Sequence, residues 1–320
     1  FGSVEGAQAA MQILVFGAGG VGGYYGARLV EAGHDVSYVA RGRHAAAMAA
    51  HGLRVRSARG DAHIAAPNVV EDPAALEPAP DVALVCVKLM HTEDAARRLA
   101  PLAARGTAVC SLQNGVDRDE VLARHCGREA LLDGTTQIGA AIAEPGVIQH
   151  TGTMANLTYG APGDGNDRRL QALDAALRDT AARTGAFEAR KSDDIRLDVW
   201  RKFTFLAPFA GLTARHRSPI GPLRADEATR QEMEQLVAET VAVGRAAGIA
   251  LPEDRESEVM AFVDGLPADM KSSMLHDLEA GKPLELDWLT GAVLRLGLRH
   301  GVAAPANQVI QDALAAYKQG

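Results

Sequence analysis

The stretch QILVFGAGGVG, residues 12–22, constrains the fold of this chain more than any other part of it. Its first five residues are mostly apolar and have the length of a buried strand, and a segment with helical spacing follows the glycines. Gly17, Gly19 and Gly22 fit the spacing G-x-G-x-x-G. In that motif the first glycine makes a tight turn, the second lets the backbone approach a pyrophosphate, and the third lets the helix pack on the strand. The stretch therefore predicts the strand, turn and helix of a Rossmann-type dinucleotide-binding domain.

The side chain that follows the second strand selects the cofactor. Proteins that bind NAD carry an acidic residue about 20 positions beyond the glycines, where it hydrogen-bonds the ribose hydroxyls. Here the strand over residues 36–39 leads into Arg41, with Arg43 and His44 close behind. A guanidinium pairs well with phosphate oxygens, so Arg41 predicts NADP(H). A merely solvated basic loop stays an alternative, more for Arg43 than for Arg41. In the glycine turn, where helix amides would face the phosphates, the predicted cofactor contacts are Gly17, Ala18, Gly19, Gly20, Val21 and Gly22.

Two further apolar runs, residues 81–88 and 107–114, have the continuous pattern of strands buried on both faces of a parallel sheet. Both end in polar residues, Lys88 and Asn114. Ligands of such sheets lie beyond the carboxyl ends of the strands, so both side chains are predicted near the nicotinamide half of the cofactor. For Asn114 a site role is favoured over a plain NG turn, whereas for Lys88 the two interpretations are evenly balanced. Residues 53–70 predict a hairpin at the edge of the sheet that carries no chemistry.

Length and composition bound the remaining possibilities. A chain of 320 residues suits two domains. It has no apolar run long enough to span a bilayer and no signal-peptide pattern, which predicts a cytoplasmic protein with no membrane partner. The formal net charge of -7 disfavours nucleic-acid binding, and the 3 widely spaced cysteines disfavour a disulfide framework. The 10 histidines lack the spacing of metal ligands, so no metal is predicted.

The expected organisation is an α/β fold with a leader, a cofactor domain and a helical domain. Residues 1–10 precede Met11 and are interpreted as a tag remnant or a disordered leader. Residues 11–190 form the NADP-binding domain, and residues 191–320 form an all-helical substrate domain that opens with Ser192 as a helix N-cap. Lys202 stands in this first helix, followed at i+4 and i+8 by Leu206 and Ala210. By itself, such a lysine most simply ends the polar half of an amphipathic helix.

The second half resembles a known family in three places. These are WRK before an apolar helix, SSMLHDLEAGKPLELD at residues 272–287, and GVAAP near the end, all behind the GAGGVG turn. Together they resemble the ketopantoate reductases (2-dehydropantoate 2-reductases), whose fold is a Rossmann-type domain followed by a 6-phosphogluconate dehydrogenase-like helical domain. The resemblance implies NADPH-dependent reduction of ketopantoate to D-pantoate in pantothenate synthesis. It also implies that Lys202 protonates the substrate carbonyl oxygen.

The same resemblance assigns four more residues. Asn114 matches an asparagine near nicotinamide and substrate, and Ser273 a serine that holds substrate. Asp277 matches an acid on the same helix, and Glu285 a glutamate that supports substrate binding and the lysine. The chain departs from the family where asparagines usually follow the lysine, because it has Leu206 and Ala210 there. Two amides that would orient a polar substrate are missing, and such losses weaken discrimination.

Three interpretations therefore remain open from the sequence. The first is ketopantoate reduction, and the second is reduction of a different, less polar 2-oxo acid by the same fold. The third is a non-catalytic NADP-binding sensor, against which the retained Lys202 and Glu285 argue. Whether the chain forms a homodimer also stays open.

Overall fold

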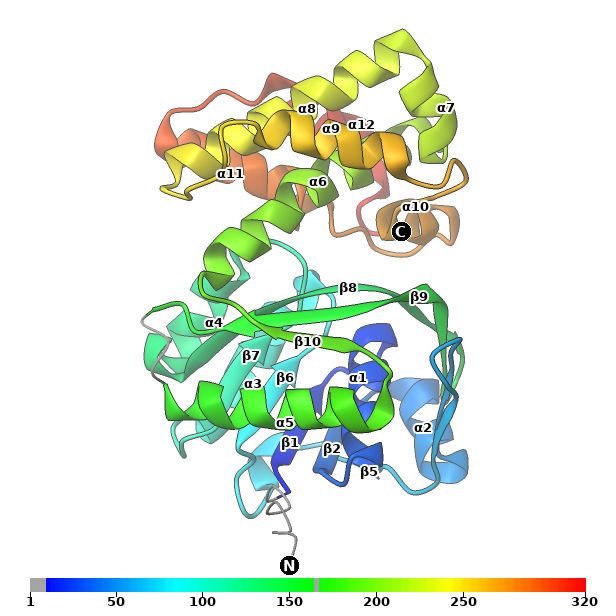
Figure 1. The fold of residues 1–320 in the computed structure, drawn as a ribbon, viewed down its shortest axis with the longest axis vertical. Coiled ribbons are helices and arrows are strands. Elements are labelled where there is room, and N and C mark those ends of the chain that lie inside the picture. Colours follow the sequence, from blue (N-terminus) through cyan, green and yellow to red (C-terminus); the bar gives the residue numbers. More distant parts are fainter. Residues whose placement is uncertain (1–9, 164–166) are drawn as a thin grey trace, which may run out of the picture. The chain divides into compact units, whose positions relative to one another are not determined.

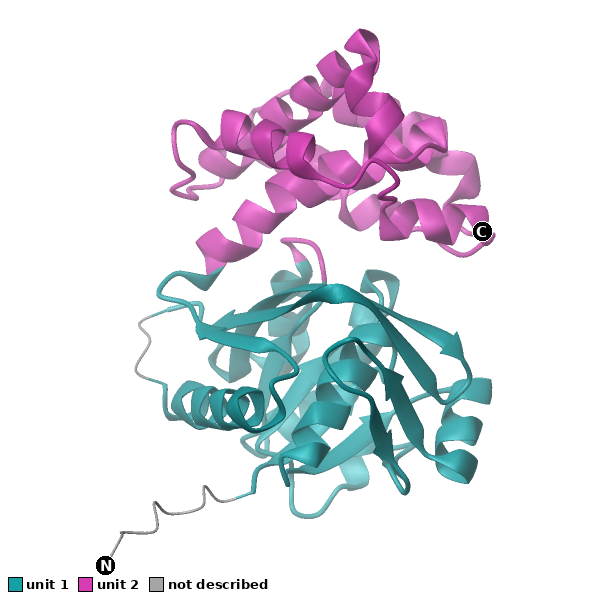
Figure 2. Ribbon diagram, turned by 45° about the vertical axis from the view of Figure 1, so that its right-hand side comes forward, with its two compact units in different colours: residues 1–113, 118–195 teal, residues 114–117, 196–320 magenta. Residues whose placement is uncertain are grey.

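The chain divides into two compact units, which Figure 2 colours separately. The computed structural model describes residues 10–163 and 167–320, so the predicted leader lies outside the described residues except for Ala10. One unit comprises residues 1–113 and 118–195, and the other comprises residues 114–117 and 196–320. The domain boundary predicted from the sequence lies after residue 190. That the short segment 114–117 belongs with the helices was not predicted.

The first unit is built on one mixed sheet with the strand order β4-β3-β9-β8-β7-β6-β1-β2-β5, and β10 pairs with β9 (Figure 1). Its strands from β8 through β7, β6, β1 and β2 to β5 pair in parallel, as the buried apolar runs predicted. The β3–β4 pair forms part of the edge hairpin predicted over residues 53–70, but residues 68–69 form β5 and pair in parallel with β2 instead. The strands are β1 (Gln12–Phe16), β2 (Asp35–Val39), β3 (Leu53–Arg56), β4 (Ala62–Ile64), β5 (Asn68–Val69), β6 (Val82–Val85), β7 (Ala108–Ser111), β8 (Leu131–Glu144), β9 (Val147–Gly160) and β10 (Glu188–Lys191).

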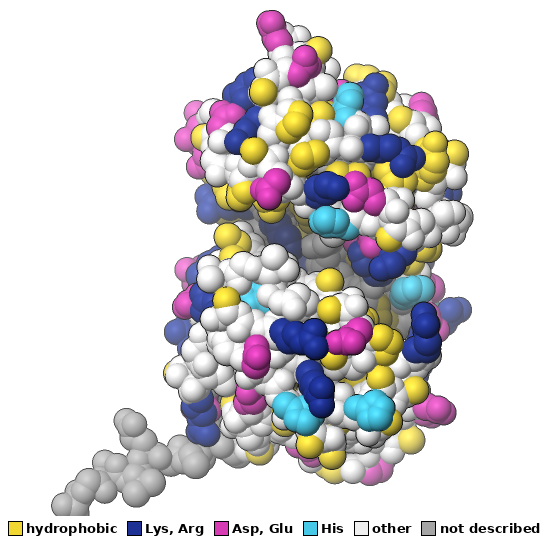
Figure 3. Space-filling view, turned by 90° about the vertical axis from the view of Figure 1, so that its right-hand side faces the viewer, with side chains coloured by type: hydrophobic (Ala, Val, Ile, Leu, Met, Phe, Trp, Pro, Cys, Tyr) yellow, Lys and Arg dark blue, Asp and Glu magenta, His cyan; other side chains and the backbone are white. Residues whose placement is uncertain are grey.

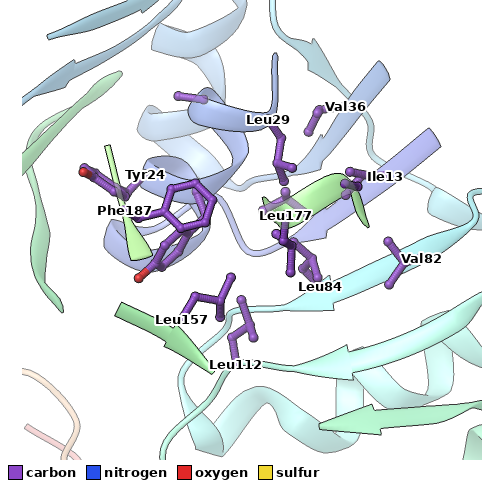
Figure 4. Close-up of a cluster of buried hydrophobic side chains, with 14 of the residues drawn as sticks. Ile13, Tyr24, Leu29, Val36, Val82, Leu84, Leu112, Leu157, Leu177 and Phe187 are labelled. Atoms are coloured by element: carbon purple, nitrogen blue, oxygen red, sulfur yellow. The ribbon is translucent and has the colours of Figure 1, made fainter. Parts of the chain in front are cut away.

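Alternate residues of the parallel strands enter two different cores. Ile13 and Val15 of β1 join the core under α1 and α5, part of which Figure 4 shows, whereas Leu14 and Phe16 join the core under α3 and α4. This division follows from the two-residue period of a strand, which sends successive side chains to opposite faces. The helices and helical turns of this unit are α1 (Gly20–Glu31), α2 (Gly42–His51), α3 (Thr92–Ala103), α4 (Arg118–Cys126), α5 (Arg168–Thr184), η1 (Pro73–Ala75), η2 (Leu89–His91) and η3 (Arg128–Ala130).

Strands β8 and β9 form a long antiparallel hairpin of 14 residues each. Strand β9 runs without a break from Val147 to Gly160, although Gly152 lies within it. Its register with β8 shifts after Ile138, where an irregularity in the ladder takes up residues 152–154 of β9. The hairpin extends the sheet past the start of α1, where Ala140 of β8 lies against Gly20.

The second unit is helical, as predicted. Its first helix, α6, begins at Ile195 rather than directly after Ser192, whose hydroxyl instead accepts a hydrogen bond from the Asp194 amide at 3.1 Å. Its own core includes Trp200, Phe203 and Leu212. The elements are α6 (Ile195–His216), α7 (Ile220–Ala225), α8 (Glu227–Ala246), α9 (Arg255–Gly265), α10 (Ser273–Glu279), η4 (Leu286–Trp288), α11 (Thr290–His300), α12 (Pro305–Leu314) and η5 (Ala315–Tyr317).

Candidate active site

The glycine turn between β1 and α1 has the geometry that the motif predicts. Gly17 has φ +106°, a conformation that side chains with a Cβ rarely adopt, and a Cβ there would lie 2.7 Å from Val87 Cγ1. A Cβ on Gly22 would lie 2.1 Å from the Gly17 carbonyl oxygen. The amides of Gly17 and Ala18 both donate to the Val39 carbonyl, at 3.0 and 3.2 Å. Packing within this unit therefore demands the first and third glycines of the motif.

Gly19 is different, because nothing in the described structure crowds it. A Cβ on Gly19 would meet no heavy atom within 4 Å, and its φ of -72° suits any residue. The fold itself gives no reason for glycine at this position. A backbone left bare beside the N-terminus of a helix is what close approach of a pyrophosphate requires, so the residues present fit a dinucleotide.

Gly20 has a structural reason that sequence reasoning missed. A Cβ there would lie 2.0 Å from the carbonyl oxygen of Ala140, which belongs to β8. The β8–β9 hairpin therefore lies directly against the first residue of α1. A pairing between residues so far apart in the chain leaves no local pattern from which it could be predicted.

Arg41 follows β2, as predicted for a residue that holds the 2′-phosphate. It is the N-cap of α2, and its exposed guanidinium pairs with the carboxylate of Asp94, near the start of α3. The side chain of Arg43 is also exposed. The His44 ring, by contrast, is turned towards the glycine turn: Nε2 lies 2.8 Å from the Ala18 carbonyl oxygen, and Nδ1 accepts from the Gly146 amide at 3.0 Å. From the sequence, His44 is predicted only to follow Arg41 and Arg43 in the chain.

A buried polar chain lies at the carboxyl ends of β6 and β7. Gln113 Nε2 donates to the Val87 carbonyl oxygen at 3.0 Å and to Thr92 Oγ1 at 2.8 Å, which fixes the loop that carries Lys88. The Gln113 side-chain oxygen accepts from Ser111 at 3.2 Å. Ser111 in turn accepts from the guanidinium of Arg118 at 2.8 Å.

Arg118 completes this hydrogen-bonded network with an ion pair to Asp133 at 2.5 Å. The side chains of Arg118 and Asp133 are 1% and 3% exposed. The network extends from the loop after β6 to β8. It therefore joins Gln113 and Arg118, the two residues that flank the segment 114–117 in the chain.

Within the helical unit, Lys202 of α6 donates a hydrogen bond from Nζ to Oδ1 of Asn114 at 2.7 Å. Both side chains are half-buried. The segment 114–117 is also attached to this unit by Val116, which packs on the helical core, and by Asp117, which pairs with Arg295 of α11 at 2.5 Å. The contact brings together two residues that the sequence analysis named separately, one after β7 and one in α6.

Leu206 and Ala210, at the two positions where the resemblance implies asparagines, lie in different surroundings. Leu206 is half-buried, one turn after Lys202, and packs at the margin of the helical core. Ala210 is 1% exposed and belongs to that core. Leu206 is therefore the one of the two whose side chain can face a ligand.

The remaining predicted residues lie on and after α10. Ser273 is the first residue of α10 and is exposed, and Asp277 one turn later is half-buried. The N-cap is the preceding residue, Ser272, which is buried and whose hydroxyl accepts a hydrogen bond from the Leu275 amide at 3.0 Å. Ser273 therefore does not cap the helix. Glu285 is 5% exposed.

Within the described ranges, no group of three His, Cys, Asp or Glu side chains is arranged to hold a metal ion, and no helix is long and apolar enough to cross a membrane. The three cysteines are free thiols. Burial raises the pKa of the Cys86 thiol to about 12 and that of Cys126 to about 11. On the face shown in Figure 3, basic and acidic side chains are interspersed on each unit, a pattern that does not favour nucleic acid.

A mixed Rossmann-type sheet with a bare glycine turn, followed by an all-helical unit, is the architecture of a class of NAD(P)H-dependent oxidoreductases. Two family descriptions match the sequence, ketopantoate reductase PanE/ApbA over residues 13–164 and ketopantoate reductase PanE/ApbA C terminal over residues 194–318. The chain belongs to the ketopantoate reductase family.

Individual relatives agree with this assignment. The 2-dehydropantoate 2-reductase of Halobacterium salinarum is 32% identical over 308 residues, covering 94% of this chain and 97% of the relative. An uncharacterized oxidoreductase of Bacillus subtilis, YkpB, is 30% identical over 312 residues, covering 96% and 99%. Among solved structures, 2-dehydropantoate 2-reductase from Geobacter metallireducens has 29% identity and a TM-score of 0.86, covering 95% of this chain and 99% of that one.

Proposed function

We propose that the chain reduces a 2-oxo acid with NADPH, and that 2-dehydropantoate (ketopantoate), reduced to D-pantoate for pantothenate synthesis, is the first candidate substrate. The observation that carries the proposal is the hydrogen bond of 2.7 Å from Lys202 Nζ to Asn114 Oδ1. This bond orients the ammonium group of Lys202 towards Asn114, which lies three residues beyond the end of β7. The relatives named 2-dehydropantoate 2-reductase support the choice of substrate.

The proposed chemistry asks two things of the protein. NADPH, when bound, supplies a hydride to the carbonyl carbon. Negative charge then develops on the carbonyl oxygen, and this oxygen needs a positioned proton donor. The ammonium of Lys202 provides both the proton and a positive charge. Asn114 orients this ammonium by accepting a hydrogen bond from one of its N–H groups. Correct orientation of a catalytic group can supply a large part of a rate enhancement.

The other predicted residues complete the proposal around this pair. Ser273 and Asp277 lie one turn apart on α10, where they can form a polar edge for the substrate. Glu285 supplies a carboxylate that supports substrate binding and Lys202. Lys88, in the loop held by Gln113, supplies a cation for the cofactor half of the site.

NADPH is preferred to NADH in this proposal because of Arg41. The guanidinium follows β2, the strand whose end meets the adenosine ribose in this fold, and no carboxylate stands at that position in the sequence. A 2′-phosphate would compete with Asp94 for this guanidinium.

A second candidate is a less polar 2-oxo acid. Leu206, half-buried one turn from Lys202, offers an alkyl group where the family's asparagine would offer an amide. The fold alone does not decide between substrates. D-mandelate dehydrogenase, whose structure with NADH and anilino(oxo)acetate has a TM-score of 0.85 at 23% identity, shares it.

The deciding experiment follows NADPH oxidation with ketopantoate and a panel of branched and aromatic 2-oxo acids, with NADH in parallel. We expect ketopantoate to have the highest kcat/KM. A faster reaction with an apolar acid would select the second candidate. Tight NADPH binding without turnover of any acid would contradict both and indicate a sensor.

A further inference from the structure

His44 lies between two parts of the first unit that meet at the glycine turn. Its Nε2 is 2.8 Å from the carbonyl oxygen of Ala18, inside the turn. Its Nδ1 accepts the Gly146 amide, in the turn between β8 and β9, at 3.0 Å. Because an amide can only donate, Nδ1 carries no proton, and the proton on Nε2 is the one donated to Ala18. The two contacts together define the tautomer of the imidazole.

The contacts act on the polar backbone of a segment whose one side chain beside the glycines, Ala18, is buried in the core. The Val39 carbonyl binds the amides of Gly17 and Ala18, which fixes the N–H side of the turn. His44 binds the carbonyl side of Ala18. Gly19, the next residue, has neither a side chain nor a neighbour within 4 Å of its Cβ position. Glycine has the greatest backbone freedom of all residues, so this part of the turn needs restraint from outside.

The β8–β9 hairpin supplies the other end of that restraint. Gly20 can approach Ala140 of β8 only because it lacks a Cβ. Gly146, with φ +82°, closes the hairpin and directs its amide to His44. The hairpin therefore contacts Gly20, the first residue of α1, directly, and it contacts Ala18 of the glycine turn through an imidazole.

We propose that His44 is a positioning residue for the dinucleotide: it binds no phosphate itself but keeps the glycine turn in its cofactor-binding shape by linking Ala18 to Gly146. The inference rests on the proposed nucleotide site. A turn that is already ordered loses less conformational freedom when it binds a ligand, so deleting the link should weaken cofactor binding and leave chemistry unchanged.

The charge of His44 gives a second readout. Burial lowers the pKa of His44, against the opposing effect of the Ala18 carbonyl. The charged groups nearest along the two connected segments are already paired, Arg41 with Asp94 and Glu144 with Arg56, while Arg43 is exposed. A protonated Nδ1 would face the Gly146 N–H and break that contact. The contribution of His44 to cofactor affinity is therefore fully present at pH values above the ordinary histidine pKa of about 6.5. It is lost as the pH falls through the lowered pKa of His44.

The test measures NADPH binding by calorimetry and kinetics for His44→Ala, His44→Gln and the control His51→Ala, an exposed histidine at the end of the same helix. We expect His44→Ala to raise the Kd about 5- to 30-fold, the effect of one to two lost hydrogen bonds, with kcat at saturating NADPH and the KM of the 2-oxo acid within about twofold of wild type. His44→Gln can keep one of the two bonds and should fall between, and His51→Ala should match wild type. The ratio of the His44→Gln Kd to the wild-type Kd removes the titration of the cofactor's own phosphate, because both proteins bind the same cofactor. As the pH falls, wild type should lose affinity beyond this shared loss, and His44→Gln should not.

Two results would overturn the inference. One is an unchanged NADPH Kd in a folded His44→Ala or His44→Gln protein, and the other is a parallel fall of kcat and thermal stability without a specific change in Kd. Binding is measured without turnover, so a wild-type protein that binds NADPH but reduces no 2-oxo acid contradicts the proposed function and leaves this inference standing. If wild type binds no dinucleotide, both fail.

Discussion

Lys202 and Asn114, 88 positions apart, are joined by a hydrogen bond of 2.7 Å between Nζ and Oδ1. The lysine comes from α6 and the asparagine from the short segment after β7, which belongs to the helical unit despite its place in the chain. An amide oxygen is a suitable partner for a proton donor because it orients the ammonium without adding the full charge of a carboxylate.

The first prediction concerns this pair. Lys202→Ala should lower kcat about 10²- to 10⁴-fold, the usual contribution of general acid catalysis. Asn114→Ala should lower it less, and the double variant should be no slower than Lys202→Ala, because the two side chains act as one unit. Steady-state NADPH oxidation measures this. Arg201→Ala, the exposed neighbour, is the matched control, and a loss there equal to that of Lys202→Ala would contradict a specific role.

The second prediction concerns substrate choice. Leu206→Asn restores an amide one turn after Lys202, and it should raise kcat/KM for ketopantoate about tenfold relative to a less polar 2-oxo acid, the value of about one hydrogen bond. Leu206→Ala is the control, since it removes bulk and adds no amide. Ala210→Asn is unsuitable, because Ala210 is 1% exposed and the added volume would disturb the core. An equal response of both acids to Leu206→Asn would remove Leu206 from the specificity argument.

The third prediction separates the cofactors. Arg41→Ala should raise the KM for NADPH about 10- to 100-fold, the range for a hydrogen bond to a charged group, and should change the KM for NADH less than twofold. Asp94→Asn removes the carboxylate that competes for Arg41 and should lower the KM for NADPH. Arg43→Ala is the control on the same exposed segment. If it matched Arg41→Ala, the guanidinium of Arg41 would have no special part.

The fourth prediction distinguishes two adjacent glycines. Gly20→Ala should lower thermal stability, because its Cβ would lie 2.0 Å from the Ala140 oxygen. Gly19→Ala should leave stability nearly unchanged, since no atom lies within 4 Å, but should weaken dinucleotide binding. Thermal unfolding and calorimetric titration measure the two effects. Unimpaired binding by a folded Gly19→Ala protein would argue against phosphate approach at this point.

The fifth prediction concerns the buried ion pair of Arg118 and Asp133. Arg118→Met leaves the Asp133 carboxylate without its partner and should lower the free energy of unfolding by about 3–5 kcal/mol. Arg124→Met on the same helix breaks an exposed pair with Glu93 and should cost less than about 1 kcal/mol. Urea unfolding compares them. Similar losses in both variants would show that burial does not set the cost.

Local pattern was enough to predict much of this protein. Strand, glycine turn and helix at residues 12–31 follow from hydrophobic period and glycine spacing, both of which act over a few residues. Leu170, Leu173 and Leu177 form the buried face of α5, as their helical spacing predicts. The resemblance in the second half led to the family that the comparisons show.

Boundaries and cross-chain contacts were harder to predict. Ser192 has the chemistry of an N-cap, yet the helix begins at Ile195, because local hydrogen bonds of a serine favour turns as well as caps. The continuity of β9 across residues 147–160 depends on its pairing with β8, and a strand with a register shift shows no clean alternation.

The sequence by itself determined the kinds of element, the dinucleotide turn and the family, since each depends on residues close together in the chain or on a combination of short motifs. Only the tertiary structure decided that Lys202 meets Asn114, that Gly20 makes room for β8, and that His44 links Ala18 to Gly146. These contacts join residues brought together by the packing of whole elements. The partners in these contacts are set by the sheet order and by the face that each helix buries. No local spacing in the sequence predicts either of these.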